Sequence, residues 1–174
     1  MTLFSALQYS KLASHAVLSE CRCYRYALSR VWDSTKPYAL FIGLNPSTAD
    51  ETEDDPTIRR CISFAKSWGY GGLVMANLFA YRATDPDEMK VAAEPIGINN
   101  NDWLTELANH AGVVVAAWGN HGAFKQRSSH VRGLLTELHY LQLNQLGEPA
   151  HPLREFNFEV RHSPMPPDGT LRIP

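Results

Sequence analysis

The chain contains no uninterrupted apolar run that approaches the ~20 residues a membrane-spanning helix needs. Its beginning also lacks the basic start, apolar core and small-residue cleavage site of a signal peptide. Cysteine is scarce: Cys21, Cys23 and Cys61 are an odd number without a Cys-x-x-Cys pair, which argues against a disulfide framework and a zinc knuckle. We therefore expect a cytoplasmic protein that has no membrane partner.

An excess of charge of one sign is also missing. Lysine and arginine number 16, aspartate and glutamate number 18, and the formal net charge is -2. No overall field therefore draws the protein onto nucleic acid, although arginines can still cluster on one local face. This balance favours a small substrate, or a transient encounter with nucleic acid, over tight binding to duplex DNA. The oligomeric state stays open.

The composition is ordinary for one well-buried globular domain, with 174 residues of which 44% are hydrophobic and 20% charged. We expect this domain to span residues 1–154, with residues 1–20 as a covering segment. Residues 155–174 hold four prolines and little periodicity, which predicts an extended C-terminal tail.

Short apolar runs alternate with helical periodicities along the domain. Residues 38–42 form a continuous apolar run between turn-forming residues, as in a buried strand. Asp55 can cap a helix that begins at Pro56, and apolar residues then recur at helical spacing as far as Trp68. The same patterns predict strands at 21–32, 38–42, 72–79, 112–118 and 139–143, and helices at 56–68, 101–110 and 121–138.

This alternation predicts an α/β fold, a three-layer α/β/α sandwich around a central, mainly parallel sheet of four strands. Residues 21–32 alternate with period two, which predicts a strand of mixed exposure at the N-terminal edge of the sheet. One face of that strand is expected to carry Tyr24, Tyr26, Leu28, Arg30 and Trp32.

Ligands of open α/β sheets bind at the carboxyl ends of the strands, and four loops are expected to meet there. Polar and aromatic side chains are concentrated in all four. The loops run from Asn45 to Asp50, from Asn77 to Asp85, from Trp118 to Gly122 and from Ala150 to Arg154.

Each of these signals also has a simpler interpretation. Asn45-Pro46 and His151-Pro152 are typical of turns, and Asn77 can tie down a neighbouring loop through its amide. Trp118 to His121 can be a strand end followed by a helix cap. The acidic run from Asp50 to Asp55 is typical of a solvated face and matches no calcium loop, so no metal or other cofactor is predicted. A weaker hypothesis is a metal-dependent enzyme that uses Asp50, Asp54 and Asp55.

The order of the motifs resembles the uracil-DNA glycosylase superfamily. The resemblance rests on Gly43-Leu44-Asn45-Pro46 after a strand, Asn77 at the end of the next strand, the run from Val113 to His121, and His151-Pro152-Leu153. The first motif is most similar to that of the mismatch-specific branch. Residues 21–154 also resemble a bacterial and phage family of unknown function, through Tyr24-Arg25-Tyr26, Gly43 to Asp50, Asp55-Pro56-Thr57 and Asn77 to Thr84.

The glycosylase resemblance implies a glycosylase-like fold and a role for each matching residue. Asn45 would position the attacking water with help from Asp50, because many of these enzymes have a carboxylate where this chain has Asn45. Asn77 would read a base edge through its amide, and His151 would stabilise the departing base. Leu153 would insert as a wedge and Arg154 would hold phosphate. Gly43, Pro46, Ser47 and Thr48 would complete the first loop.

Two hypotheses of different classes follow. The first is a hydrolase of the glycosylase type that acts on a nucleobase in DNA or on a nucleoside or nucleotide. The second is a non-catalytic nucleotide- or nucleic-acid-binding protein with the same pocket. In the second, Arg82 and Arg154 would hold phosphate, Trp118 or Tyr81 would stack on a base, and Asn120 and His121 would add contacts. A carboxylate beside the position of an attacking water favours the first hypothesis.

Overall fold

The computed structural model describes residues 14–154, 163 and 164. Within these ranges no helix has both the length and the apolar character needed to cross a membrane. The predicted covering segment, residues 1–20, is described only from Ser14, and most of the predicted C-terminal tail lies outside the described residues.

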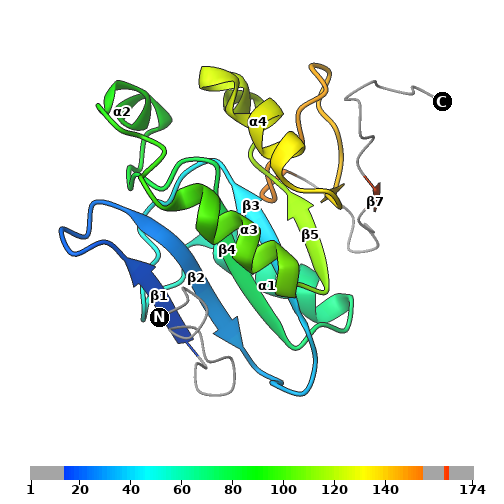
Figure 1. Cartoon of the computed structure of the whole chain (residues 1–174). Coiled ribbons are helices and arrows are strands. Elements are labelled where there is room, and N and C mark those ends of the chain that lie inside the picture. The colour runs from blue at the N-terminus through cyan, green and yellow to red at the C-terminus, as the bar shows by residue number, and fades with distance from the viewer. Residues whose placement is uncertain (1–13, 155–162, 165–174) are drawn as a thin grey trace.

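A single mixed sheet forms the centre of the fold (Figure 1). Its strand order is β1-β2-β4-β3-β5-β6-β7, and the four strands β4, β3, β5 and β6 run parallel to one another. The flanking pairs β1·β2, β2·β4 and β6·β7 are antiparallel. The strands are β1 Ser14–Leu18, β2 Arg25–Val31, β3 Tyr38–Gly43, β4 Gly72–Asn77, β5 Val113–Ala116, β6 His139–Tyr140 and β7 Ser163–Pro164. The predicted parallel core of four strands is confirmed.

The strand predicted at the sheet edge, β2, lies instead between β1 and β4. The predicted edge position was wrong because β1 comes from the segment that was read as a covering element. The sequence of β2 also contains Arg25 and Arg30. Arginines in a strand usually indicate an exposed face, but both of these residues are buried.

The period-two pattern of β2 is interrupted by a register shift. Val17 of β1 lies opposite Ala27, but Leu18 lies opposite Arg25, so Tyr26 is an extra residue in β2. Tyr26 and Leu28 consequently pack on opposite faces of the sheet, whereas strict alternation had predicted a shared face.

In the described part of the chain, four α-helices connect or cover the strands: α1 Pro56–Ser67, α2 Pro86–Val91, α3 Asn100–His110 and α4 Arg127–Leu134. Asp55 and Asp85 cap α1 and α2, and a proline opens each of these helices. The continuous helix predicted over 121–138 is wrong. A 3₁₀ helix, η3 (Asn120–Gln126), precedes α4, and positive φ angles of 51° at Lys125 and 55° at Gln126 separate the two. The break allows Phe124 to pack against Phe79, with ring centroids 5.7 Å apart.

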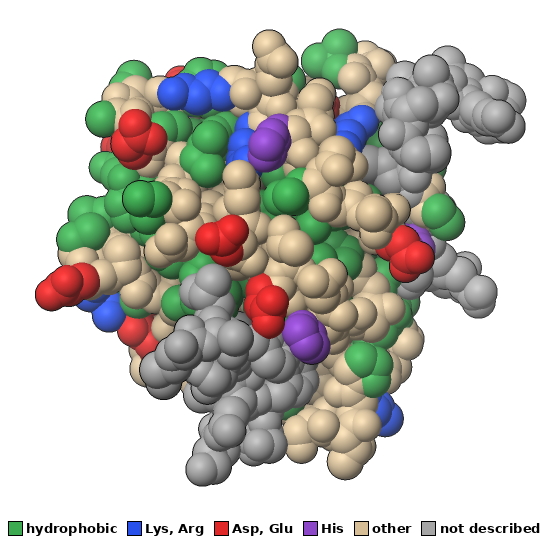
Figure 2. Space-filling view, viewed as in Figure 1, with side chains coloured by type: hydrophobic (Ala, Val, Ile, Leu, Met, Phe, Trp, Pro, Cys, Tyr) green, Lys and Arg blue, Asp and Glu red, His purple; other side chains and the backbone are tan. Residues whose placement is uncertain are grey.

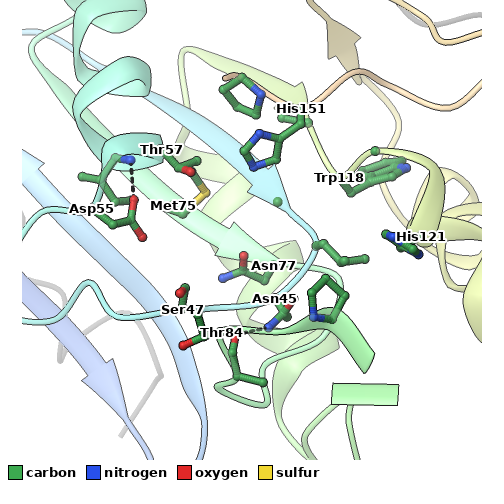
Figure 3. A pocket seen from close by; sticks show the side chains of 18 of the residues that line it. Asn45, Ser47, Asp55, Thr57, Met75, Asn77, Thr84, Trp118, His121 and His151 are labelled. Atoms are coloured by element: carbon green, nitrogen blue, oxygen red, sulfur yellow. Dashed lines mark hydrogen bonds between the residues drawn. The ribbon is translucent and has the colours of Figure 1, made fainter. Parts of the chain in front are cut away.

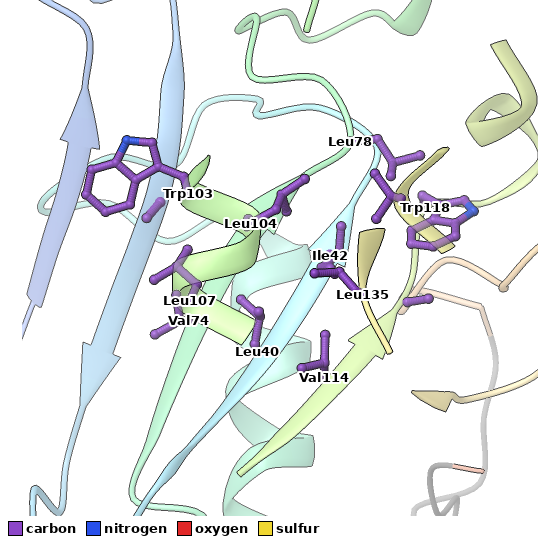
Figure 4. Close-up of a cluster of buried hydrophobic side chains, with 14 of the residues drawn as sticks. Leu40, Ile42, Val74, Leu78, Trp103, Leu104, Leu107, Val114, Trp118 and Leu135 are labelled. Atoms are coloured by element: carbon purple, nitrogen blue, oxygen red, sulfur yellow. The ribbon is translucent and has the colours of Figure 1, made fainter. Parts of the chain in front are cut away.

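Helices lie on both faces of the sheet, as predicted. On one face, Phe41, Met75 and Val115 pack with Ile58 and Phe64 of α1, and other buried residues extend this layer. On the opposite face, the side chains of α3 pack against the even-numbered residues of β3, β4 and β5 (Figure 4), and α4 adds Val131 to the same layer. That second layer includes Leu40, Ile42, Val74, Val114, Trp103, Leu104, Leu107 and Val131.

The second layer yields a stability prediction. Leu104 is fully buried, so L104A should lower the free energy of unfolding by about 2–5 kcal/mol through lost burial and a residual cavity. Ile98 is 94% exposed, and I98A should change the same quantity by no more than about 0.5 kcal/mol. Urea denaturation measures both variants. Equal effects of the two substitutions would contradict this packing.

Candidate functional site

A cavity of about 500 Å³ lies at the carboxyl ends of the central strands (Figure 3). It lies on the α1 side of the sheet, because Gly43, Asn77 and Ala117 continue the alternation that places Phe41, Met75 and Val115 against α1. The N-terminal end of α1 supplies a second wall through Asp55, Thr57 and Ile58. The predicted site edge is therefore where the cavity forms.

Asn77 is the central polar group of the cavity. Its side chain is only 3% exposed, and its Nδ2 has no hydrogen-bond partner among the described residues. Two features fix its position. Gly43 lies beside it in the parallel ladder, where a Cβ would come within 3.0 Å of Asn77 Oδ1. On the other side, Asn100 Nδ2 donates to the main-chain carbonyls of Asn77 at 3.0 Å and Leu78 at 2.9 Å.

Asn45, Ser47 and Thr84 lie next to Asn77 in the close-up of the cavity (Figure 3). Asn45 Nδ2 donates to the carbonyl of Ala83 at 2.8 Å and to that of Pro46 at 3.2 Å. Because its amide nitrogen is occupied in this way, Asn45 offers the cavity its Oδ1, a hydrogen-bond acceptor.

The carboxylate that lines the cavity is Asp55 and not Asp50. Asp50 Oδ1 accepts from the main-chain N–H groups of Thr52 and Glu53, both at 2.9 Å, and these bonds lower the pKa of Asp50. Asp55 Oδ1 accepts from the N–H of Ile58 at 2.9 Å, which leaves its second oxygen for the cavity. Sequence reasoning assigned Asp55 only as a helix cap or a metal ligand.

His151 faces the cavity from the loop that follows the last parallel strand (Figure 3). Its Nδ1 accepts from the N–H of Leu153 at 3.3 Å, so the neutral ring carries its proton on Nε2. Burial lowers the pKa of His151, and the nearby Asp55 carboxylate partly opposes this shift. At neutral pH the ring is therefore an uncharged hydrogen-bond donor.

Trp118 lines the cavity as part of the core. The ring is 1% exposed and belongs to the hydrophobic layer of α3 and α4. Its Nε1–H donates to Glu148 Oε2 at 2.7 Å, and Glu148 also accepts from Ser128 at 2.9 Å and pairs with Arg132 at 3.2 Å. A Cβ on residue 122 would lie 2.2 Å from this ring, which explains why residue 122 is a glycine. Trp118 is thus a fixed wall and not a free stacking surface.

The structure brings together nine of the predicted site residues from four loops. They are Gly43, Asn45, Ser47, Asn77, Trp118, Asn120, His121, His151 and Arg154. Six predicted residues are absent from the cavity lining: Pro46, Thr48, Asp50, Tyr81, Arg82 and Leu153.

Local contacts account for several of these six positions. Tyr81 packs edge-on against Tyr24, with ring centroids 5.7 Å apart, and Arg82 donates to the carbonyl of Arg22 at 3.3 Å. Thr48 is exposed and Pro46 is buried. Leu153 is 49% exposed beside the cavity.

Arg25, Asp55, Thr57 and Thr84 line the cavity although sequence reasoning did not assign them to it. The signal for Arg25 and Thr57 was present in the motifs Tyr24-Arg25-Tyr26 and Asp55-Pro56-Thr57. Those motifs carry no chemistry by themselves, because their positions relative to the loop after β3 depend on the tertiary fold.

The metal hypothesis finds no support in the described ranges. No group of three or more His, Cys, Asp or Glu side chains in the described part of the chain could hold an ion. Asp54 instead forms an ion pair with Arg30 at 2.9 Å, and Asp50 is engaged in its own turn.

The fold and the cavity together define an α/β protein whose candidate ligand site lies at the carboxyl edge of a parallel sheet core. The sequence profile of a family described as a protein of unknown function (DUF1643) matches residues 25–153. The chain belongs to this family, in agreement with the resemblance drawn from its motifs. Neither the curated proteins nor the solved structures contain a match to the chain.

The environment of His151 makes its titration a test of the cavity. The ordinary pKa of histidine is about 6.5, and the pKa of folded His151 is lower. As the pH falls below 6.5, His151 therefore binds a proton in the unfolded chain before it does so in the folded protein. The free energy of unfolding should therefore decrease as the pH falls from that value towards the lower folded pKa. Urea denaturation at several pH values checks this slope, and H151N should reduce it. An unchanged slope in H151N would contradict the assignment.

Proposed function

We propose that the cavity binds a nucleobase-containing ligand and hydrolyses its N-glycosidic bond, as an enzyme of the uracil-DNA glycosylase type. The observation that carries this proposal is the buried amide nitrogen of Asn77, which has no partner among the described residues and lies in a cavity that Asp55 and His151 also line. A carboxamide offers one donor and one acceptor side by side, which matches the edge of a nucleobase. Buried polar groups are otherwise almost always satisfied, so this amide indicates a ligand.

The cavity contains the two chemical functions that N-glycosidic hydrolysis requires. The free oxygen of Asp55 and the Oδ1 of Asn45 can orient a water whose oxygen bonds to the anomeric carbon. As the C–N bond breaks, its electron pair leaves with the base, and the Asp55 carboxylate accepts a proton from the water. The Nε2–H of neutral His151 can donate a hydrogen bond to the negative charge that develops on the base.

The motif resemblance supports the same function. The residues that match the glycosylase motifs, Asn45, Asn77 and His151, come from distant parts of the sequence and line one cavity. The carboxylate function is assigned to Asp55, which stands in the place of Asp50 in the original hypothesis.

A second candidate function is ligand binding without catalysis. It is favoured by the role of Asp55 as a helix cap, because one carboxylate oxygen is already committed to Ile58. Apart from Asp55, the polar lining consists of amides, hydroxyls, histidines and arginines. Binding to long duplex DNA gains no support from the face of the molecule seen in Figure 2. The charged side chains of the described residues are scattered over the face seen in Figure 2, with both signs mixed.

A ligand screen followed by a base-release assay tests the proposal. The purified protein is screened by thermal shift against nucleobases, nucleosides, nucleotides and short DNA strands that carry uracil, hypoxanthine or mismatches. A ligand present at about 100 times its dissociation constant adds about 2.7 kcal/mol to the free energy of unfolding. Each ligand that binds is then incubated with the protein, and the free base is quantified by chromatography.

The two functions are separated by D55N. Asparagine caps helices as well as aspartate does, so D55N should keep α1 intact while it removes the carboxylate. For a hydrolase we expect kcat to fall by about 10²-fold or more with little change in ligand affinity. D85N is the matched control, because Asp85 is the N-cap of α2, where its side chain accepts from the N–H of Asp87, and it lies outside the cavity lining. Base release at the wild-type rate in D55N would refute the catalytic role.

Asn77 provides a test of recognition. N77A removes an amide whose Nδ2 has no partner among the described residues, so the free energy of unfolding should change little, whereas ligand affinity should fall more than about tenfold (~1.4 kcal/mol). Isothermal titration calorimetry measures the affinity, and the melting temperature reports the fold. Full binding by N77A would remove the central observation behind the proposal.

A further inference from the structure

Arg25 is a buried cation on the cavity whose side chain is only 2% exposed. Its Nη1 donates to the carbonyl of Ala49 at 2.6 Å, and its Nε has no partner among the described residues. No ion pair in the described part of the chain includes Arg25, in contrast to Arg30 in the same strand, which pairs with Asp54 at 2.9 Å. A buried guanidinium without a counter-ion is costly to desolvate.

The local backbone directs Arg25 towards the cavity. The extra residue Tyr26 interrupts the alternation of β2, so Arg25 lies on the α1 side of the sheet, together with Leu28. A bulge that re-aims a side chain is a common feature beside binding sites. The bond from Nη1 to Ala49 then ties the guanidinium to the loop that follows β3.

The charge of the lining is positive although the protein is negative overall. Arg25 and Arg154 line the cavity against a single carboxylate, Asp55, whereas the whole chain has a net charge of -2. The carboxylate of Asp55 acts on Arg25 from a distance beyond ion-pair contact, since it raises the pKa of Arg25 against the larger effect of burial. The N-terminal end of α1 adds its positive potential to the same wall.

We propose that Arg25 binds the phosphate of a free nucleoside monophosphate, so that the ligand of the cavity is a mononucleotide. The nucleoside part of this inference rests on the proposed function, whereas the anion-binding part rests on Arg25 alone. The cavity volume of about 500 Å³ lies within the range of small-molecule sites and accommodates one nucleotide. A phosphate offers the guanidinium charge-assisted hydrogen bonds that the described residues do not supply.

The test compares neutral and phosphorylated forms of the same ligand. Adenosine, guanosine, cytidine, uridine and their 5′-monophosphates are titrated calorimetrically into the wild type, R25M, R25K and R82M. Wild-type protein should bind at least one monophosphate tenfold or more tightly than its nucleoside. R25M should lose this advantage, and R25K should keep part of it.

R82M is the matched control. Arg82 lies near enough to influence Arg25 electrostatically but does not line the cavity, so R82M removes one nearby positive charge without changing the site. It should keep the preference for the monophosphate. The same loss in R82M and R25M would indicate a general field effect and overturn the inference. If R25M does not fold, as its melting curve reports, the comparison rests on R25K.

The remaining outcomes separate this inference from the proposed function. Equal affinity of the wild type for nucleosides and monophosphates would overturn the role of Arg25 and leave the proposed function standing. Stabilisation by inorganic phosphate that R25M abolishes, without binding of any nucleoside or nucleotide, would keep the anion site and overturn the proposed function. Binding only to uracil-containing oligonucleotides would overturn the mononucleotide assignment. An equal loss of nucleoside and monophosphate binding in R25M would overturn the inference. It would indicate that Arg25 acts only through its hydrogen bond to the carbonyl of Ala49.

Discussion

The close approach of β3 and β4 at their carboxyl ends is the constraint on which the site depends. Gly43 and Asn77 are neighbours in the parallel ladder, and the carboxamide occupies the space that a side chain on residue 43 would need. Asn100 holds the main chain of Asn77 and Leu78 from the opposite side of the sheet. Gly43 and Asn100 therefore fix Asn77 in a position where its Nδ2 has no partner among the described residues. The free-energy cost of a buried amide nitrogen without a hydrogen bond is typical of binding sites.

The other cavity groups are held by bonds that each leave one function free. Asn45 uses its amide nitrogen on Ala83 and keeps an acceptor, and Asp55 uses one oxygen on α1 and keeps the other. His151 uses Nδ1 on the following loop and keeps a donor. In each side chain, one polar atom forms a hydrogen bond that stabilises a loop or a helix end. The other polar atom remains available to a ligand.

Local patterns were sufficient to predict the four parallel strands, α1 and α3, because their apolar periodicity and their caps agree with the tertiary packing. They failed where tertiary contacts override them. The break before α4 accompanies the packing of Phe124 against Phe79, and the bulge in β2 occurs where it pairs with β1. The convergence of the loops was predictable from topology, and nine predicted residues line the cavity. The presence of Asp55 in the cavity lining in place of Asp50 was not predictable, because acidic residues of one run differ only in which main-chain N–H groups their carboxylates reach.

Net charge is a poor guide to the charge that lines the cavity for a related reason. A net charge of -2 argues against long-range attraction of nucleic acid, but it says nothing about a cation that the fold has removed from water. In a low-dielectric wall, one guanidinium acts on a bound group far more strongly than several exposed charges do. Arg25 is 2% exposed and screened from salt by the sheet and the loop after β3. The local arrangement of Arg25, Asp55 and Arg154, rather than the total charge, therefore determines which ligands the cavity favours.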